Sequence, residues 1–491
     1  MSANLPVLLV VVPLLCAPLA ALTRRPRPAW GVAMLAAGWA FVVSILLLSR
    51  VLAQGTISYH IGDWAPPWGI EYRIDEVNAF VVLIVSGIAA VVTPYARRSV
   101  EREIDATRIP LFYTAYVLCM AGLLGISVTG DVFNVFVFLE ISSLSAYALI
   151  AQGPDRRALT ASYQYLIMGS IGATFIVIGI GLMYVMTGTL NMADLAQRLP
   201  MVDANRTIPV AFAFLAVGIS LKLALFPLHL WLPNAYTYAP SAVTAFIAST
   251  ATKVAVYMLL RFFFTIFGAA FAFDVMHLDR VLMPLAIIAI VTMSLSAIYQ
   301  VNVKRLLAYS SIAQIGYMIL GISLASVTGL TAGILHLFNH ALMKGGLFLA
   351  VGAVMYRTGS VRLRAMEGLG REMPWTMAAF VLAGLSLIGV PLTVGFVSKW
   401  YLVLAGLEKG WWPVAAVVLV GSLLAAIYIW KVVEVAYFRE RSREEPVREA
   451  PLALLLPMWI LVLANYYFGM HADLTVGVAH RAAQVLMGVA Q

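Results

Sequence analysis

Charged residues are scarce in this sequence. Only 11% of its 491 residues are Asp, Glu, Lys or Arg and 62% are hydrophobic, whereas a soluble globular domain carries roughly a quarter charged residues. Water is therefore not the main solvent of this chain. A hydrocarbon core about 30 Å thick takes about 20 apolar residues per helical crossing, so the chain can supply many crossings and has no room for a separate soluble domain.

Cysteine and nucleotide-binding motifs are as scarce as charge. The two cysteines, Cys16 and Cys119, lie in apolar stretches without a CxxC or histidine-rich neighbourhood, which argues against a disulfide or a metal site. The sequence has no Walker motif, no GxGxxG after a strand and no cysteine cluster for iron–sulfur. We therefore expect no cofactor, no metal and no enzymatic activity of the chain itself. Its energy has to come from an ion gradient or from a partner.

The apolar runs predict an all-α polytopic membrane protein with about fourteen transmembrane helices. Backbone groups in hydrocarbon must bond internally, and the runs show no alternating strand pattern, so each run is expected to be a helix. The predicted spans are 4–22, 29–49, 76–96, 110–128, 131–151, 161–187, 208–232, 240–267, 281–300, 305–325, 328–356, 375–405, 411–438 and 451–469.

The basic residues follow the pattern of membrane topology signals. Loops after odd-numbered spans hold 19 Lys and Arg, with Lys304 among them, whereas the other side holds 8, with Arg261 among them. Because cytoplasmic loops are enriched in Lys and Arg, this asymmetry predicts cytoplasmic odd-numbered loops and both termini on the outer side of the cell membrane. The net charge of +9 is thus explained by topology and does not call for a nucleic-acid partner.

Apart from residues at span ends, five lysines and two glutamates remain inside the predicted spans. They are Lys222, Lys253, Lys344, Lys399, Lys431, Glu140 and Glu434. Arginine stays protonated under almost all conditions, whereas a lysine taken out of water can release its proton, so the exclusive use of lysine favours proton handling. An ionisable group at membrane depth costs about 2.5–3.5 kcal/mol on insertion scales and is a functional hypothesis by default.

These residues also have structural interpretations. Glu140 follows the expected helix cap Asp131 by nine residues, which is about 13 Å into the membrane at 1.5 Å per residue. For Glu140 and the deep lysines the alternative to transport is a structural ion pair. Lys431 and Glu434 lie near an interface, where they can simply extend to the headgroups, so they are only secondary candidates.

Two sequence patterns suggest a path for protons. His336, His340 and Lys344 are spaced by four residues and share one helix face. Two such histidines can bind zinc, but no HExxH glutamate or third ligand accompanies them, so a proton-carrying stripe is favoured.

Helix breakers form the second pattern. Phe226-Pro-Leu-His-Leu-Trp-Leu-Pro233 interrupts the seventh span and Gly389-Val-Pro-Leu-Thr-Val-Gly395 the twelfth, because proline removes a backbone donor. Lys222 and Lys399 lie beside these breaks. In transporters built from inverted repeats, a broken helix that carries a charged residue at corresponding positions of the two halves indicates an ion site. A simple kink is the alternative. His229, within the first break, is a further candidate.

Taken together, these motifs resemble the D-type subunits of the Mrp family of multisubunit Na⁺/H⁺ antiporters, and more distantly the antiporter-like subunits of respiratory complex I and membrane-bound hydrogenases. The resemblance runs almost end to end. It is carried by Gly62-Asp-Trp-Ala-Pro-Pro-Trp-Gly-Ile70, Gly130-Asp-Val-Phe-Asn-Val-Phe-Val-Phe-Leu-Glu140, Thr187-Gly-Thr-Leu-Asn-Met-Ala-Asp-Leu195, Phe226 to Pro233 and Phe338-Asn-His-Ala-Leu-Met-Lys-Gly-Gly346.

The resemblance implies a fold and a set of roles. It implies three N-terminal helices (1–109), two inverted five-helix repeats (helices 4–8, 110–267, and helices 9–13, 281–438) and a C-terminal helix with a tail (451–491). It further implies that Glu140 pairs with Lys222, that Lys253 relays protons, that the His336/His340/Lys344 stripe links the two halves, and that Lys399 is the terminal charge.

The family works in hetero-oligomers, so the expected partners are Mrp subunits of the A, B, C, E, F and G type, with H⁺ and Na⁺ as transported ions. Two alternatives to an antiporter subunit stay open. One is a proton-pumping subunit of a redox complex, in which a partner oxidises NADH, formate or hydrogen. The other is a scaffold that has lost transport, although unused buried charges would destabilise it.

Overall fold

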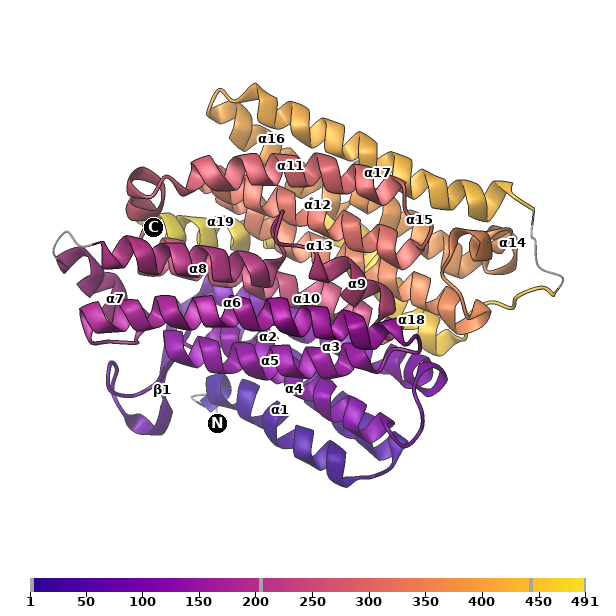
Figure 1. Ribbon diagram of the computed structural model, residues 1–491, viewed down its shortest axis with the longest axis horizontal. Coiled ribbons are helices and arrows are strands. Elements are labelled where there is room, and N and C mark those ends of the chain that lie inside the picture. Colours follow the sequence, from indigo (N-terminus) through magenta and orange to yellow (C-terminus); the bar gives the residue numbers. More distant parts are fainter. Residues whose placement is uncertain (1–3, 203–205, 441–444, 490–491) are drawn as a thin grey trace.

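Long helices that run side by side make up the computed structural model (Figure 1), which describes residues 4–202, 206–440 and 445–489. The long helices are α1 (Leu5–Leu22), α2 (Pro26–Gln54), α3 (Glu76–Glu103), α4 (Ile109–Val128), α5 (Val132–Ala151), α6 (Arg157–Thr187), α8 (Thr207–Leu223), α10 (Ser241–Leu260), α11 (Leu278–Ile298), α12 (Val303–Ser323), α13 (Val327–Thr358), α15 (Pro374–Ile388), α16 (Val394–Glu408), α17 (Trp412–Phe438), α18 (Leu452–Met470) and α19 (Asp473–Met487). The short elements are β1 (Ile57–His60), β2 (Glu71–Ile74), α7 (Met192–Arg198), α9 (Trp231–Tyr238) and α14 (Leu369–Glu372).

The predicted membrane spans are present as helices. Among the described residues, 12 helices are long and apolar enough to cross a membrane. Two further crossings are interrupted, one made of α8 and α9 and the other of α15 and α16. Together they match the fourteen predicted spans, so the all-α polytopic fold class and the two broken helices are confirmed. The inverted relation of the two repeats, and the domain limits drawn from it, stay predictions.

Some secondary structure lies outside the predicted spans. Residues 57–74 form an antiparallel hairpin in which Ile57 pairs with Ile74 and His60 with Glu71. The expected C-terminal tail contains α19, whose buried residues Val478, Ala482 and Leu486 recur at helical spacing and pack on α13 and α3. A helix that lies on a bundle needs only one apolar stripe, so α19 contains no long apolar run of the kind that marks a crossing.

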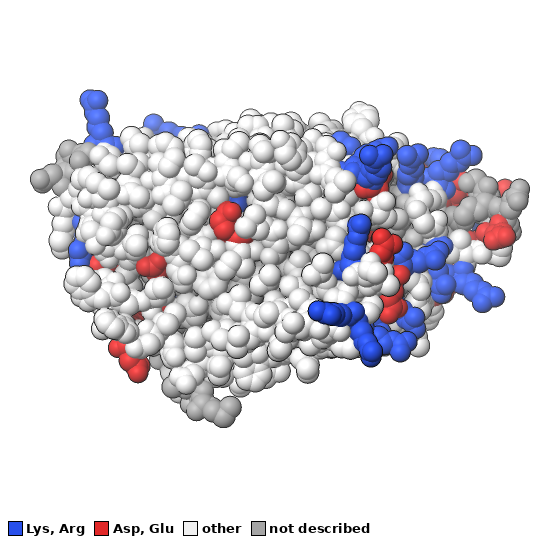
Figure 2. Space-filling model, turned by 60° about the horizontal axis from the view of Figure 1, so that its bottom comes forward, with Lys and Arg blue, Asp and Glu red and all other residues white. Residues whose placement is uncertain are grey.

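Charged side chains gather at the two ends of the bundle. Figure 2 shows a broad uncharged band between the ends, interrupted by an acidic patch near its middle, with basic side chains most densely gathered at the end drawn on the right. This end, termed the basic end, is formed by residues 23–25, 104–108, 152–156, 299–302, 359–373, 439–440 and 445–451. The two chain termini lie at the opposite end (Figure 1), as an even number of crossings requires.

Glycine contacts bring the helices that flank the first break close together. An added Cβ at Gly218 of α8 would lie 2.7 Å from the backbone oxygen of Gly172 on α6, and one at Gly179 would lie 3.0 Å from the oxygen of Ala211. Small residues allow close backbone approach between membrane helices, where dispersion contacts replace the hydrophobic effect. The close contact fixes the end of α8, which carries Lys222.

The topology can be tested by cysteine labelling in intact cells, in a background that lacks Cys16 and Cys119. We expect cysteines at Arg102 and Arg362, both exposed at the basic end, to react with a membrane-impermeant thiol reagent only after the membrane is opened. A cysteine at Asp473, exposed at the opposite end, should react without opening. The reverse pattern would contradict the orientation derived from the basic residues.

Candidate ion-translocation site

The first helix break holds a buried ion pair. α8 ends at Leu223 because Ala224 adopts a left-handed conformation with φ of 58°, and Lys222 lies in the last turn. Lys222 Nζ is 3.7 Å from Glu140 Oε1 of α5 and donates a hydrogen bond of 3.0 Å to Ser143 Oγ. The lysine is thus held by one hydroxyl and by the field of one carboxylate.

The two partners of this pair are unequally shielded. The side chain of Lys222 is 3% exposed, whereas that of Glu140 is 28% exposed. Within the described residues Glu140 Oε1 accepts no hydrogen bond, and a separation of 3.7 Å is too long for one. The attraction therefore rests on charge alone, which makes it sensitive to any other charge or dipole that approaches.

The second helix break supplies acceptors for Lys399. α15 ends at Gly389, which has a φ of 92°, and the last carbonyl groups of that helix have no partner further along it. Lys399 of α16 donates to two of them, Leu387 O at 3.0 Å and Ile388 O at 2.8 Å, and to Ser422 Oγ at 3.0 Å. The cation lies at the negative end of the helix dipole, where a positive charge is stabilised.

α10 and α13 carry the ionisable groups between the two breaks. Lys253 is fully buried and donates to Ala248 O on its own helix. Lys344, also fully buried, donates to Leu307 O at 2.9 Å and to Ser310 Oγ on α12. Both lysines act electrostatically on His340, whose two ring nitrogens have no hydrogen-bond partner in the described structure. An imidazole with two free nitrogens can take a proton on one and release it from the other.

His336 connects this centre to the second break. Its ring lies parallel to that of His340, with the centroids 6.0 Å apart. His336 Nδ1 is 2.8 Å from Ser398 Oγ and Nε2 is 3.0 Å from Gln314 Oε1. Ser398 directly precedes Lys399, whose Nζ lies 4.9 Å from the ring centroid of Tyr317.

A small cavity adjoins the first break on the side of α10. It measures about 30 Å³ and is lined by Ser143, Tyr165 and Lys222, and by Ala251 and Val254 of α10. These two α10 residues flank Lys253 in the sequence. A polar space needs at least about 10–15 Å³ to hold a water molecule, so the cavity can hold a water molecule beside Lys222, Ser143 and Tyr165.

The secondary candidates lie outside this series. His229 is buried between α8 and α9, where its ring stacks on Phe226. Lys431 donates to Ile298 O at 2.7 Å and Gln300 O at 3.1 Å and so caps the end of α11. Glu434 forms an ion pair of 3.1 Å with Arg439, and both are well exposed. The structural interpretation accounts for the contacts of Lys431 and Glu434, and a part in transport stays a prediction.

Two basic residues that the sequence assigned to loops or span ends are buried. Lys304, in the first turn of α12, is 3% exposed, and Arg261, just after α10, is 6% exposed. Hydropathy alone could not show this burial, because it does not reveal that a helix end is covered by its neighbours. The capping signal of Asn302, which accepts from Arg305 N at 3.1 Å, could have shown that Lys304 begins a helix.

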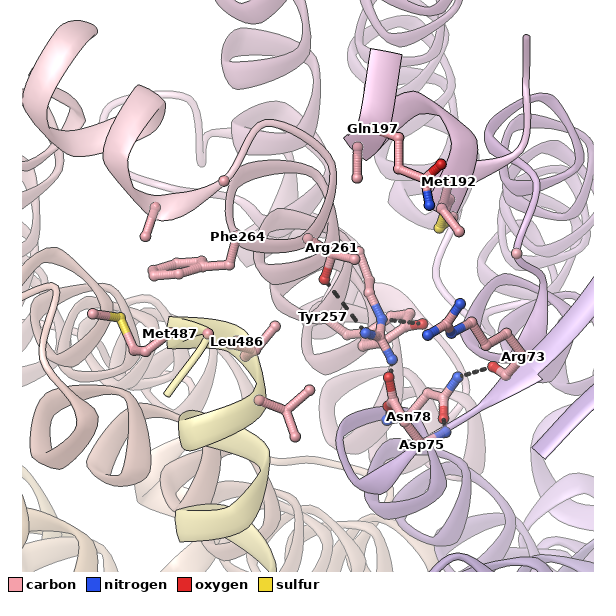
Figure 3. Close-up of a pocket in the computed structure, with 18 of the residues that line it drawn as sticks. Arg73, Asp75, Asn78, Met192, Gln197, Tyr257, Arg261, Phe264, Leu486 and Met487 are labelled. Atoms are coloured by element: carbon pink, nitrogen blue, oxygen red, sulfur yellow. Dashed lines mark hydrogen bonds and ion pairs between the residues drawn. The ribbon is translucent and has the colours of Figure 1, made fainter. Parts of the chain in front are cut away.

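Arg261 forms a second buried ion pair, at the end opposite the basic end (Figure 3). It pairs with Asp75, the residue that caps α3, and donates a hydrogen bond of 3.0 Å to Tyr257 Oη. Asn78 and Arg73 lie beside the pair, in the wall of a cavity of about 620 Å³ that the end of α19 also lines. The pair ties the end of α10 to the start of α3. The sequence gives no sign of this pair, because its partners lie 186 residues apart.

No group of three or more His, Cys, Asp or Glu side chains within the described ranges could hold a metal ion. His336 and His340 instead contact a serine, a glutamine and each other. The arrangement is a series of buried proton donors and acceptors that joins two broken helices.

The sequence of this chain matches a known protein family. The family described as NADH:quinone oxidoreductase/Mrp antiporter, TM, matches residues 129–425, which is more than half of the chain. The chain belongs to this family. The match covers every residue of the ionisable series from Glu140 to Lys399.

Individual relatives come from two kinds of complex. NADH-quinone oxidoreductase subunit N of Desulforudis audaxviator is 42% identical over 96% of both chains. The D-type Na⁺/H⁺ antiporter subunit of Alkalihalophilus pseudofirmus is 31% identical over 88% of this chain and 86% of the relative. A chain in the structure of the Mrp complex from a Dietzia species has a TM-score of 0.91 at 27% identity and covers 99% of this chain and 97% of its own. The resemblance to the D-type Mrp subunits is thereby confirmed, and similarity to a complex I subunit stands beside it.

Gly389 gives a test of the second break in this family member. An added Cβ at Gly389 would lie 3.0 Å from Lys399 Cδ at a φ of 92°, so Gly389→Ala should displace Lys399 and lower proton transport in vesicles. Gly188 also has a positive φ, of 71°, but its Cβ would meet nothing within 4 Å. Both alanine variants should lose about 1–2 kcal/mol through left-handed backbone strain, measured by unfolding. Equal transport in both would show that the position of Lys399 is unimportant.

Proposed function

We propose that the chain is the ion-translocating membrane subunit of a multisubunit Na⁺/H⁺ antiporter of the Mrp type. It conducts protons through Glu140, Lys222, Lys253, His340, Lys344, His336 and Lys399. The observation that carries this proposal is the series of ionisable groups between the two helix breaks. Its links are the ion pair of Lys222 with Glu140, the electrostatic action of Lys253 and Lys344 on His340, the parallel rings of His340 and His336, and the contact of His336 with Ser398 beside Lys399.

Glu140 and Lys222 act as the switch in this mechanism. Attraction to Glu140 keeps Lys222 charged at rest, because an isolated ammonium group out of water is strongly disfavoured. When a positive charge approaches the exposed side of Glu140, it competes for the carboxylate and weakens the pair. Lys222 then gives up its proton toward α10 and Lys253. The separation of 3.7 Å and the absence of a hydrogen bond to Glu140 Oε1 support a pair that can open without breaking a strong contact.

The histidine stripe passes the proton to the second break. His340 receives it from the side of Lys253 and Lys344, and His336 carries it toward Ser398 and Lys399. Because Lys399 is held by carbonyl oxygens, it can keep or release a proton without leaving a charged partner behind. The membrane potential supplies about 2.3 kcal/mol per charge per 100 mV, which can drive electrogenic exchange of more protons than sodium ions.

The host complex lies in the cell membrane with the basic end in the cytoplasm and both termini outside. Its other members are subunits of the Mrp A, B, C, E, F and G type. The D-type antiporter relative and the Mrp complex structure support this assembly. A second candidate, a proton-pumping subunit of a quinone-reducing complex, is supported by the 42% identity to NADH-quinone oxidoreductase subunit N.

The ion pair gives the first test of function. In vesicles with the whole complex, Glu140→Gln and Lys222→Met should each lower Na⁺-driven proton movement by about tenfold or more, because a positioned proton-transfer group typically contributes about 10²–10⁴-fold. Glu140→Asp should retain part of the activity because the charge survives at a shorter reach. Glu101→Gln, which removes an exposed acid paired with Arg98, is the matched control. Normal exchange in either neutral variant, with normal assembly, would reject the mechanism.

The histidines give an independent test. His340→Ala should lower exchange more than His336→Gln, because glutamine can still bond Ser398 and Gln314 whereas nothing replaces the free nitrogens of His340. Exchange is measured in the same vesicles, and the amount of complex is measured by immunoblot. Unchanged exchange in His340→Ala would leave the stripe with a structural role only.

The two host complexes differ in what drives the protons. A sodium gradient imposed on vesicles should move protons in the antiporter. In the second candidate only a reductant and a quinone should do so, and Lys222→Met should then uncouple the redox reaction from proton movement. Proton movement that depends on the reductant and ignores sodium would replace the antiporter proposal with the second candidate.

A further inference from the structure

A cavity of about 470 Å³ opens at the basic end, at the contact between the two halves of the bundle. Its walls come from the start of α6, the end of α9, the start of α12 and the end of α13. α9 packs on α12 at this point (Figure 1). The charged residues of its lining are Glu103, Asp155, Arg157, Lys304, Arg305 and Arg362.

Lys304 differs from the other cations of this cavity. A lysine at the end of a membrane helix normally extends its ammonium group to water or headgroups. Lys304 is instead 3% exposed, and its Nζ donates a hydrogen bond of 3.0 Å to Ala239 O, in the turn between α9 and α10. The ammonium group is therefore held on a backbone carbonyl of the cavity wall and does not extend into the surrounding water.

Glu103 supplies the negative charge in the same wall. Its Oε2 accepts from Ser241 N at 2.9 Å and from Ser241 Oγ at 3.2 Å, so it caps the N-terminus of α10. Its Oε1 accepts from Ser99 Oγ at 2.7 Å. A carboxylate with both oxygens held in this way is fixed in position, and it acts electrostatically on Lys304.

α12 connects Lys304 with the centre of the ionisable series. Leu307 O and Ser310 Oγ, which receive the hydrogen bonds of Lys344, lie one and two turns after Lys304 on the same helix. The rise between residues 304 and 310 is about 9 Å at 1.5 Å per residue. Ser310 and Lys344 are both fully buried. Ser310 thus places a hydroxyl group, which is both donor and acceptor, against Lys344 on the helix that carries Lys304.

We propose that this cavity is the vestibule through which protons enter the series from the basic end. Lys304 is the first buried proton carrier. Glu103 is a positioning residue, whose fixed negative charge in the vestibule wall acts on Lys304. A proton from water in the vestibule replaces one that Lys304 passes by way of Ser310 to Lys344, and His340 receives it next. This inference rests on the proposed proton conduction and gives it a point of uptake at the contact between the halves, away from Glu140 and Lys222.

The competing interpretation is that Lys304 merely caps the carbonyl of Ala239. Lys304→Arg separates the two roles, because arginine donates to carbonyls as well as lysine does but does not release its proton. We expect Lys304→Arg to assemble normally and to lower exchange by about tenfold or more. Lys304→Met should lower it at least as far. Arg102→Gln, an exposed position beside the vestibule, is the control and should exchange normally. Normal exchange in Lys304→Arg would overturn the proposal.

Blocking the vestibule gives a second measurement without loss of the lysine. In a background without native cysteines, a bulky impermeant thiol reagent at Ser360→Cys, in the cavity wall, should slow exchange when added from the basic side. The same reagent at Arg364→Cys, exposed at the same end but outside the wall, should leave it unchanged. Equal exchange at both labelled positions would overturn the uptake route.

Lys222→Met, measured in parallel, separates this inference from the proposed function. If Lys222→Met abolishes exchange while Lys304→Arg and the blocked vestibule exchange normally, only the vestibule is rejected. If Lys222→Met also exchanges normally, both the vestibule and the proposed proton conduction by this chain are rejected.

Discussion

Every lysine of the bundle core needs an acceptor for its ammonium group, and the backbone provides most of them. A charge in hydrocarbon is unfavourable unless its donors are bonded, and an intact helix has few carbonyl groups to spare. The backbone acceptors are Ala248 O for Lys253, Ala239 O for Lys304, Leu307 O for Lys344, Leu387 O and Ile388 O for Lys399, and Ile298 O and Gln300 O for Lys431. Several of these carbonyls belong to helix ends or to the turns that follow them. The break in α15–α16 therefore does more than bend a helix, because its free carbonyl groups create the place where Lys399 can stay.

Lys222 is the exception to this rule. It donates to a serine hydroxyl and faces a carboxylate, although it too lies at the end of a broken helix. The two breaks are thus built differently. At the first break, Lys222 depends on the charge of the Glu140 side chain, which a single substitution can remove. At the second break, Lys399 depends on the backbone carbonyl groups of Leu387 and Ile388, which remain whatever side chains these two positions carry.

Most of the fold could be predicted from the sequence, because hydrophobic length and the alternation of basic loops act over whole spans. Lys222, Lys399 and the histidine stripe could be singled out for a similar reason, since charge in an apolar run and proline beside it are local signals. The burial of Lys304 and the Arg261–Asp75 pair could not be predicted. Both depend on which helices cover a helix end, and that is decided by packing between segments distant in sequence. α19 escaped prediction because its apolar stripe is too short to resemble a crossing.

The preference for carbonyl acceptors has a kinetic consequence. A buried carboxylate and a lysine stabilise each other so well that a proton shared between them rests in a deep free-energy well, and leaving it is slow. A carbonyl oxygen accepts a hydrogen bond from a neutral amine as well as from an ammonium group, so the two protonation states differ less. Most stations between the breaks are of this second kind. Among these stations Lys222 is the one that faces a carboxylate, and its pair with Glu140 is loose: the atoms are 3.7 Å apart, Glu140 Oε1 accepts no hydrogen bond, and the Glu140 side chain is 28% exposed. The slow release expected of a tight ion pair is thereby avoided.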